Sequence, residues 1–159
     1  MKITFFSAKP YDKESFLHAN EAYGFEFEFF ETELSAPTVE MVQSSEVVCA
    51  FVNDKLNRQV LEALAVKGVK MIALRCAGFN NLDIEAAREL GIRVCRVPAY
   101  SPEAVAEHAL AMVMALNRKT HKAYNRVREQ NFSLQGLLGF NLYQKTVGVI
   151  GTGNIGKAI

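Results

Sequence analysis

The sequence predicts an α/β protein in which a parallel sheet is covered by helices. Up to about residue 100, short apolar runs rich in β-branched and aromatic residues alternate with segments whose apolar positions recur at helical spacing. This alternation is the pattern of strand–helix–strand units, whose strands run parallel. Near the carboxyl end, residues 145–159 form another apolar run that leads into a glycine-rich turn.

Five apolar runs predict five strands in the first part of the chain. The runs are residues 3–6, 25–30, 47–52, 69–74 and 92–97. Residues 25–29 alternate strictly between Phe and Glu, which favours an edge strand with one wet face. Residues 69–74 are apolar enough to be buried on both faces, so we expect this strand at the centre of the sheet.

Helices are expected between these strands. The candidate segments are residues 11–23, 38–43, 57–67 and 82–90. Gly91 follows the last of them, where a left-handed C-terminal cap is expected.

A longer helix is expected to begin at residue 102 and to continue to about residue 128. Ser101 is a good N-cap residue and Pro102 suits the first helical turn. Basic residues gather toward the expected carboxyl end, where positive charge complements the helix dipole, so we interpret them as a solvated face and not as a nucleic-acid site. We place the domain boundary here, with residues 1–100 as the first domain and residues 101–159 as the beginning of a second.

Composition excludes several kinds of partner. Eighteen Lys and Arg residues against 17 Asp and Glu give a formal net charge of +1, so nothing in the bulk charge favours nucleic acid or an anionic membrane. No apolar stretch is long enough to span a bilayer, and no signal peptide precedes the first strand. Cys49, Cys76 and Cys95 lack CxxC spacing, so we expect reduced core thiols in a cytoplasmic protein.

Gly151, Gly153 and Gly156 form a GxGxxG motif directly after a strand-like run. The first glycine permits a tight turn, the second lets the backbone approach a pyrophosphate, and the third lets a helix pack closely. Because the motif joins an apolar run to a segment that can begin a helix, a dinucleotide site is favoured over an incidental turn. The acidic residue that would hold the ribose is not in the sequence, so NAD and NADP are not distinguished.

The loop after the fourth strand is a second candidate site, because ligands of open parallel sheets bind beyond the carboxyl ends of the strands. Backbone amides of Ala77 and Gly78 could bind a carboxylate, and Asn80 or Asn81 could cap the next helix. The segment could equally be a turn that only connects strand and helix. Arg75 could balance a substrate carboxylate, or it could brace the loop by hydrogen bonds to carbonyl groups.

Three ordered motifs resemble the D-isomer-specific 2-hydroxyacid dehydrogenases, and within that family the bacterial fermentative D-lactate dehydrogenases. The motifs are RCAGFNNLD at residues 75–83, VPAYSPEAVAEH at residues 97–108 and GVIGTGNIG at residues 148–156. The resemblance covers nearly the whole chain. It implies a flavodoxin-like substrate domain followed by the start of a Rossmann NAD-binding domain.

The resemblance also implies roles for individual residues. Amides of Ala77 and Gly78 would hold the substrate carboxylate, and Tyr100 would line the pocket. Val105 would press on the nicotinamide. The pyrophosphate would meet the glycine loop through Gly151, Gly153, Asn154, Ile155 and Gly156.

The family's catalytic arginine, glutamate and histidine have no counterpart in these residues. His108 is interpreted as a structural helix residue, and His18 and His121 as surface residues. No metal-ligand spacing is present. We therefore expect the sequence to be the amino-terminal part of a longer enzyme, inactive by itself and a poor binder of NAD.

The expected activity is reduction of pyruvate to D-lactate with NADH. The alternatives are another D-2-hydroxyacid dehydrogenase, acting on glycerate, phosphoglycerate or a branched acid, and a dinucleotide-sensing protein without turnover. A homo-oligomer, dimer or tetramer, is expected for the full-length protein. Its candidate contact surface is the long helix with Tyr124 and the apolar residues 132–140.

Overall fold

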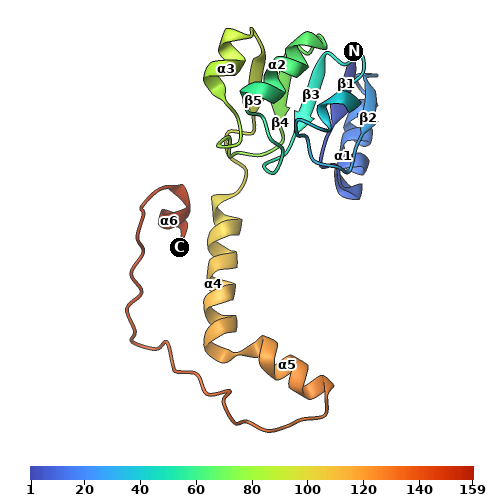
Figure 1. The fold of residues 1–159 in the computed structure, drawn as a ribbon. Coiled ribbons are helices and arrows are strands. Elements are labelled where there is room, and N and C mark those ends of the chain that lie inside the picture. Colours follow the sequence, from blue (N-terminus) through green and yellow to red (C-terminus); the bar gives the residue numbers. More distant parts are fainter. The chain divides into compact units, whose positions relative to one another are not determined.

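The computed structural model describes all residues from Met1 to Ile159, and the chain divides into two compact units, Met1–Pro98 and Ala99–Ile159. The first unit holds a five-stranded sheet with three α-helices and one turn of 3₁₀ helix (Figure 1). In chain order the elements are β1 (Lys2–Phe5), α1 (Pro10–Asn20), β2 (Glu26–Phe29), η1 (Val39–Met41), β3 (Val47–Ala50), α2 (Arg58–Val66), β4 (Met71–Leu74), α3 (Ile84–Glu89) and β5 (Arg93–Arg96).

All neighbouring strands pair in parallel, in the order β2-β1-β3-β4-β5. This is the flavodoxin-like order, in which the sheet grows in both directions from the first strand. The α/β fold class and the flavodoxin-like arrangement are therefore confirmed. The edge position predicted for residues 25–30 is confirmed, because β2 pairs only with β1.

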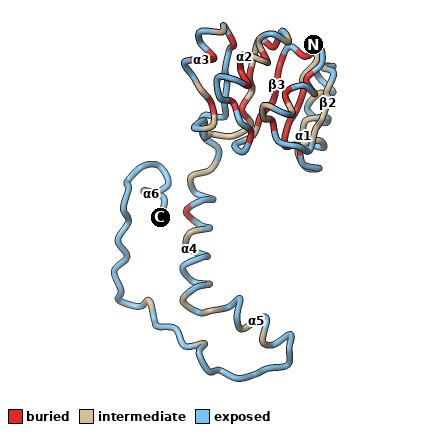
Figure 2. Tube along the Cα trace, viewed as in Figure 1, coloured by how far each residue is buried: buried red, intermediate tan, exposed pale blue.

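The central strand is β3 and not β4, which corrects the expectation for residues 69–74. All four residues of β3 are buried, whereas β4 lies one position further out and buries only Ile72 and Leu74 fully. β4 is less buried than β3 because helices cover the two faces of the sheet unevenly. The larger core cluster packs α2 and α3 on one face, and the smaller one packs Phe16 of α1 on Phe5 and Cys49 of the other face. Figure 2 shows the buried positions gathered in the sheet and the elements beside it.

The second unit contains α4 (Pro102–Arg118), α5 (Thr120–Arg128) and α6 (Asn154–Ala158). The Ser101 hydroxyl accepts a hydrogen bond from the Ala104 amide, so the predicted N-cap is confirmed. The single helix predicted for residues 102–128 is wrong, because Lys119 adopts a left-handed conformation with φ of 51° and separates α4 from α5. No helix of the chain is both long and apolar enough to cross a membrane.

The strand predicted before the glycine motif is also absent. Residues 147–150 form no strand, and the Ile150 side chain is fully exposed. A strand needs a neighbour to accept its backbone hydrogen bonds, and none of the five strands lies in this unit. The apolar run therefore has the composition of a buried strand without the sheet that would bury it.

Candidate functional site

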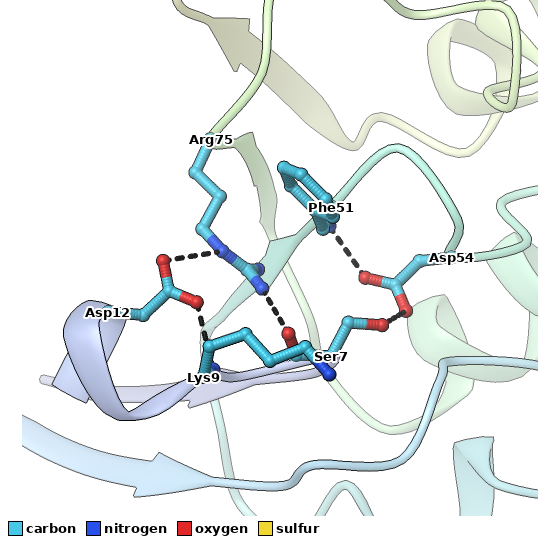
Figure 3. Close-up of polar contacts among 6 residues, drawn as sticks. All are labelled: Ser7, Lys9, Asp12, Phe51, Asp54 and Arg75. Atoms are coloured by element: carbon cyan, nitrogen blue, oxygen red, sulfur yellow. Dashed lines mark hydrogen bonds and ion pairs between the residues drawn. The ribbon is translucent and has the colours of Figure 1, made fainter. Parts of the chain in front are cut away.

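The loops at the carboxyl edge of the sheet are joined by a buried polar network. Because all five strands are parallel, the segments that follow β1, β3 and β4 leave the sheet at the same edge. Ser7 follows β1, Phe51 and Asp54 follow β3, and Arg75 follows β4, and Figure 3 shows their side chains directed toward one another. Ligands bind at this edge in open parallel sheets, so the network lies where a site is expected.

Asp54 is the centre of the network and is completely buried. Its carboxylate accepts hydrogen bonds from the Ser7 hydroxyl at 2.8 Å and from the Phe51 amide at 2.6 Å (Figure 3). It also accepts from the Leu34 amide at 2.7 Å. Buried charge is tolerated only where hydrogen bonds replace water, and three donors meet that need. One side chain thus fixes the segments that follow β1, β2 and β3.

Arg75 braces the same edge from β4. Its Nη2 donates to the Ser7 carbonyl oxygen at 2.7 Å, and its Nε lies 3.4 Å from Oδ1 of Asp12 in α1. The guanidinium also stacks on the Phe51 ring, with 5.0 Å between Cζ and the ring centroid. The side chain is 8% exposed, and these contacts correspond to the bracing alternative. Direct contact between Arg75 and a substrate carboxylate stays a prediction.

Residues 76–79, which we call the amide loop, follow Arg75 and carry an unequal set of hydrogen bonds. The Ala77 carbonyl accepts from Arg96, the Gly78 carbonyl from the Cys76 thiol, and the Phe79 carbonyl from the Leu82 amide. The Ala77 and Gly78 amides, by contrast, donate to no acceptor in the chain. Three carbonyl groups of the loop thus accept hydrogen bonds while the Ala77 and Gly78 amides remain free to donate, which is an arrangement that suits an anion.

The helix cap predicted at Asn80 or Asn81 is wrong. Asp83 caps α3, its carboxylate accepting from the Ala86 amide at 2.9 Å. Asn81 instead donates to the carbonyl oxygens of Phe51 and Asp54, at 3.1 and 2.8 Å. Its amide therefore ties the β4–α3 connection to the β3–α2 connection, a long-range contact that local spacing does not reveal.

The glycine motif of the second unit has the local shape that a pyrophosphate requires. Gly151 has a φ of 99°, and a Cβ atom on Gly156 would collide with the Gly151 carbonyl oxygen. At Gly153 a Cβ atom would meet nothing within 4 Å, so its backbone is open to a ligand. A hollow of about 430 Å³ borders these residues and Asn154 and Ile155. The residues present thus fit a dinucleotide phosphate: the backbone requires glycine at Gly151 and Gly156, and Gly153 leaves room for the ligand.

The remaining predicted residues lie in the second unit. Tyr100 precedes α4 and is 72% exposed, and Val105 lies on the first turns of α4 at 39% exposure. Arg75, Ala77 and Gly78 are brought together in the first unit, and Gly151 to Gly156 in the second. The substrate and cofactor roles of all these residues stay predictions.

Two cysteine thiols near the network are held protonated. Burial raises the pKa of Cys49 in β3 to about 12, with the charge of Arg75 opposing the shift. Burial also raises the pKa of Cys76, again opposed by Arg75. All three cysteines are free, but the expected core position is wrong for Cys95, which is exposed on β5. Neither Cys49 nor Cys76 is therefore activated as a nucleophile.

Sequence reasoning missed Ser7, Asp54 and Arg96 as parts of the site. Asp54 carried a usable signal, because a carboxylate soon after a buried strand must lie at the carboxyl edge of a parallel sheet. Ser7 carried little signal, since its conformation, with φ of 52°, is not the one expected for serine.

A flavodoxin-like sheet, free amide donors at its carboxyl edge and a separate dinucleotide loop are the features of a two-domain, nucleotide-dependent class of α/β protein. The model of the D-isomer-specific 2-hydroxyacid dehydrogenase catalytic domain matches residues 3–133, and the model of the NAD-binding domain of the same family matches residues 110–159. The chain belongs to the D-isomer-specific 2-hydroxyacid dehydrogenase family.

Individual relatives agree with this assignment. A 2-hydroxyacid dehydrogenase homolog of Haemophilus influenzae is 59% identical over all of this chain and 48% of its own length. The apo-structure of D-lactate dehydrogenase from Escherichia coli is 58% identical, with a TM-score of 0.91 over 99% of this chain and 50% of that one. The D-lactate dehydrogenase from Aquifex aeolicus, complexed with NAD and lactic acid, is 32% identical, with a TM-score of 0.77 over 98% of this chain and 46% of that one.

The chain spans about half the length of the curated relatives that it matches. The prediction of NAD as the cofactor is confirmed at the level of the family, because the model that covers the glycine loop is that of the family's NAD-binding domain. The predicted start of a Rossmann domain is confirmed by the same match.

Proposed function

We propose that the full-length protein is an NAD-dependent D-lactate dehydrogenase that reduces pyruvate to D-lactate. The observation that carries the proposal is the amide loop, in which Ala77 and Gly78 keep free amides while the carbonyls of Ala77, Gly78 and Phe79 are all occupied. Such a loop binds the carboxylate that every 2-keto acid carries. The names of the Escherichia coli and Aquifex aeolicus relatives support the lactate assignment.

In this proposal the chain supplies binding and orientation. The Ala77 and Gly78 amides hold the substrate carboxylate, and Arg75 keeps the β4 end of the loop in place through Ser7 and Asp12. Tyr100 lines the substrate pocket. The reduced cofactor, NADH, would supply the hydride to the 2-keto carbon and leave as NAD. The proton donor and the residue that orients it come from the part of the protein outside this sequence.

The second unit supplies the cofactor contacts in the same proposal. Val105 presses on the nicotinamide ring, and the backbone of Gly151, Gly153 and Gly156 receives the pyrophosphate with Asn154 and Ile155. Unpaired amides at the start of a helix attract an anion, and the open backbone at Gly153 allows its approach.

The experiment is a substrate panel on the purified full-length protein. NADH consumption is followed with pyruvate, hydroxypyruvate and branched 2-keto acids, and the hydroxy acid formed is resolved on a chiral column. We expect pyruvate to give the highest kcat/KM and the D-enantiomer as product. Preference for a larger keto acid would replace the lactate assignment by another activity of the family. Absence of turnover on every 2-keto acid, with retained NADH binding, would point to a dinucleotide-sensing protein.

We also propose that the full-length protein is a dimer or tetramer. The second unit exposes large apolar side chains that a second copy could cover. They include Tyr124 at 63%, Phe132 at 74% and Phe140 at 61% exposure. Light scattering after gel filtration is expected to give the mass of a dimer or a tetramer, and a monomer at micromolar concentration would contradict the proposal.

A further inference from the structure

Arg96 contacts both neighbours of Gly78 in the amide loop. It is the last residue of β5 and pairs with Leu74, the last residue of β4, so it stands where the loop begins. Its Nη1 donates to the Ala77 carbonyl oxygen at 2.9 Å. Its guanidinium also lies over the Phe79 ring, with 5.1 Å between Cζ and the ring centroid. One side chain thus holds the residue before Gly78 and the residue after it.

The same guanidinium fixes the chain that leaves β5. Nη1 lies 3.2 Å from the Pro98 carbonyl oxygen and 3.4 Å from that of Val97. Three carbonyl groups from two separate loops therefore converge on one nitrogen. Nη1 carries two N–H groups that these acceptors share, while the planar guanidinium also lies over the Phe79 ring, a contact that the flexible ammonium group of lysine does not reproduce.

The contact at Ala77 determines the direction of the Gly78 amide. The Ala77 carbonyl and the Gly78 N–H belong to one planar trans peptide group, so they point in opposite directions. Holding the oxygen at Arg96 therefore turns the N–H away from Arg96, on the side where no protein acceptor meets it. A hydrogen bond from a charged donor to the carbonyl also polarises the peptide and strengthens the N–H as a donor.

We infer that Arg96 is a positioning residue that aims and polarises the Gly78 amide for the substrate carboxylate without touching the substrate. This inference rests on the proposed function, since it assigns a role toward the same carboxylate. The Cys76 thiol, donating to the Gly78 carbonyl at 3.2 Å, restrains the next peptide group in the same sense. The competing explanation is that the positive charge of Arg96 attracts the substrate directly. Lysine at this position would preserve that attraction but would not restore the positioning of the amide.

The test compares Arg96→Gln and Arg96→Lys with the matched control Arg93→Gln in the full-length protein. Arg93 is the first residue of the same strand and is exposed, so the control removes an equal charge from β5 without touching the amide loop. KM for pyruvate, KM for NADH, kcat and the inhibition constant of oxamate, which carries the same carboxylate, are measured for each. Circular dichroism and thermal unfolding confirm that each variant is folded.

We expect Arg96→Gln to raise KM for pyruvate and the inhibition constant of oxamate together by about tenfold, the equivalent of about 1.4 kcal/mol. KM for NADH and kcat stay within about twofold, because the lost interaction concerns carboxylate binding alone. Arg96→Lys recovers only a small part of the loss, since the ammonium group lacks the planar face that lies over the Phe79 ring. Arg93→Gln behaves as the parent protein.

Three results would overturn the inference. The first is parental oxamate binding in Arg96→Gln, the second is full recovery by Arg96→Lys, and the third is an equal loss in Arg93→Gln. Each leaves the proposed function intact, because the parent enzyme still turns over pyruvate. A parent protein that neither reduces a 2-keto acid nor binds oxamate would instead contradict the proposed function, and with it the site on which Arg96 acts.

Discussion

A Cβ atom on Gly78 would meet nothing within 4 Å, and the backbone there does not lie in the left-handed region. Folding of this unit therefore does not demand glycine at that position. In the proposed function, a methyl group would instead stand beside the free amides that bind the substrate carboxylate. Gly156 is the opposite case, because a Cβ atom there would collide with the Gly151 carbonyl oxygen, so the local fold requires glycine.

Gly78→Ala in the full-length protein is therefore expected to raise KM for pyruvate about tenfold or more while changing the free energy of unfolding by less than about 0.5 kcal/mol. Steady-state kinetics and urea unfolding measure the two effects on the same preparation. Gly156→Ala serves as the contrast and is expected to weaken NADH binding. A loss of stability in Gly78→Ala that matched the loss of affinity would show that glycine serves the fold.

Asp54 illustrates a residue whose removal should be costly to the fold. Asp54→Ala leaves the Ser7 hydroxyl and the Leu34 and Phe51 amides without their acceptor in a buried place. Each buried donor left without an acceptor costs about 1–3 kcal/mol, so a loss of at least about 3 kcal/mol in the free energy of unfolding is expected. Urea unfolding of this chain measures it, with exposed Asn53→Ala as the matched control. A loss below about 1 kcal/mol would contradict the central role of Asp54.

The buried thiol of Cys49 makes stability depend on pH in the alkaline range. Its pKa is raised from 9.0 to about 12 in the folded chain, so the unfolded chain loses this proton first as pH rises. The contribution of this thiol to the free energy of unfolding is present below pH 9 and is lost as pH rises from there toward 12. We expect the free energy of unfolding of Cys49→Ser to fall less steeply over this pH range than that of the parent chain. Alkylation at pH 9 is expected to modify Cys95 and to spare Cys49. Rapid alkylation of Cys49 in the native chain would contradict the shift.

At the scale of the elements, the sequence predicted the pattern of the sheet well and its details poorly. Each of the five apolar runs corresponds to a strand, although β5 is exposed at all four positions, and the edge position of β2 followed from its alternation. The break at Lys119 and the missing strand at residues 147–150 were not predictable in the same way. The first depends on a single backbone conformation, and the second on the presence of a neighbouring strand.

The residues of the candidate site also fall into those that the sequence identified and those that it did not. Ala77 and Gly78 were identified because the end of a parallel strand is a known position for ligands. Arg96 and Asn81 were not, because their partners lie 19 and 27 to 30 residues away in the chain. Contacts of this kind follow from the register of the sheet, which apolar periodicity alone does not give.

The cap of α3 offers a prediction at this scale. Asp83, and not Asn80 or Asn81, satisfies the first amides of the helix, so Asp83→Ala is expected to lower the free energy of unfolding by about 1 kcal/mol. Asp83→Asn, which keeps an accepting oxygen, should recover most of the loss. Thermal unfolding of the three proteins measures the effect. Equal losses in Asp83→Ala and Asp83→Asn would show that the charge and not the cap matters.

At the scale of the whole molecule, the two units differ in how far each buries its apolar residues. The first unit holds nearly all of the fully buried side chains, with Phe5, Phe6, Leu61 and Ile72 among the largest. The second unit buries only Ala106 and leaves most of the apolar residues of α4 in water. Its glycine loop therefore has the shape for a pyrophosphate without a packed sheet to hold that shape rigid.

This contrast predicts weak cofactor binding by the 159-residue chain itself. A loop that becomes ordered only on binding has a lower affinity, because the entropy lost on ordering opposes binding. The α6 helix has five residues and is too short to be stable without packing. Isothermal titration with NAD is expected to give no saturable binding below about 1 mM, an affinity of about −4.1 kcal/mol, and the full-length protein should bind far more tightly. Gly153→Ala in both proteins separates specific from nonspecific heat, since only specific binding depends on that open backbone. Micromolar affinity in the 159-residue chain, lost in Gly153→Ala, would show that the loop is already rigid and that the second unit needs no further packing to bind the cofactor.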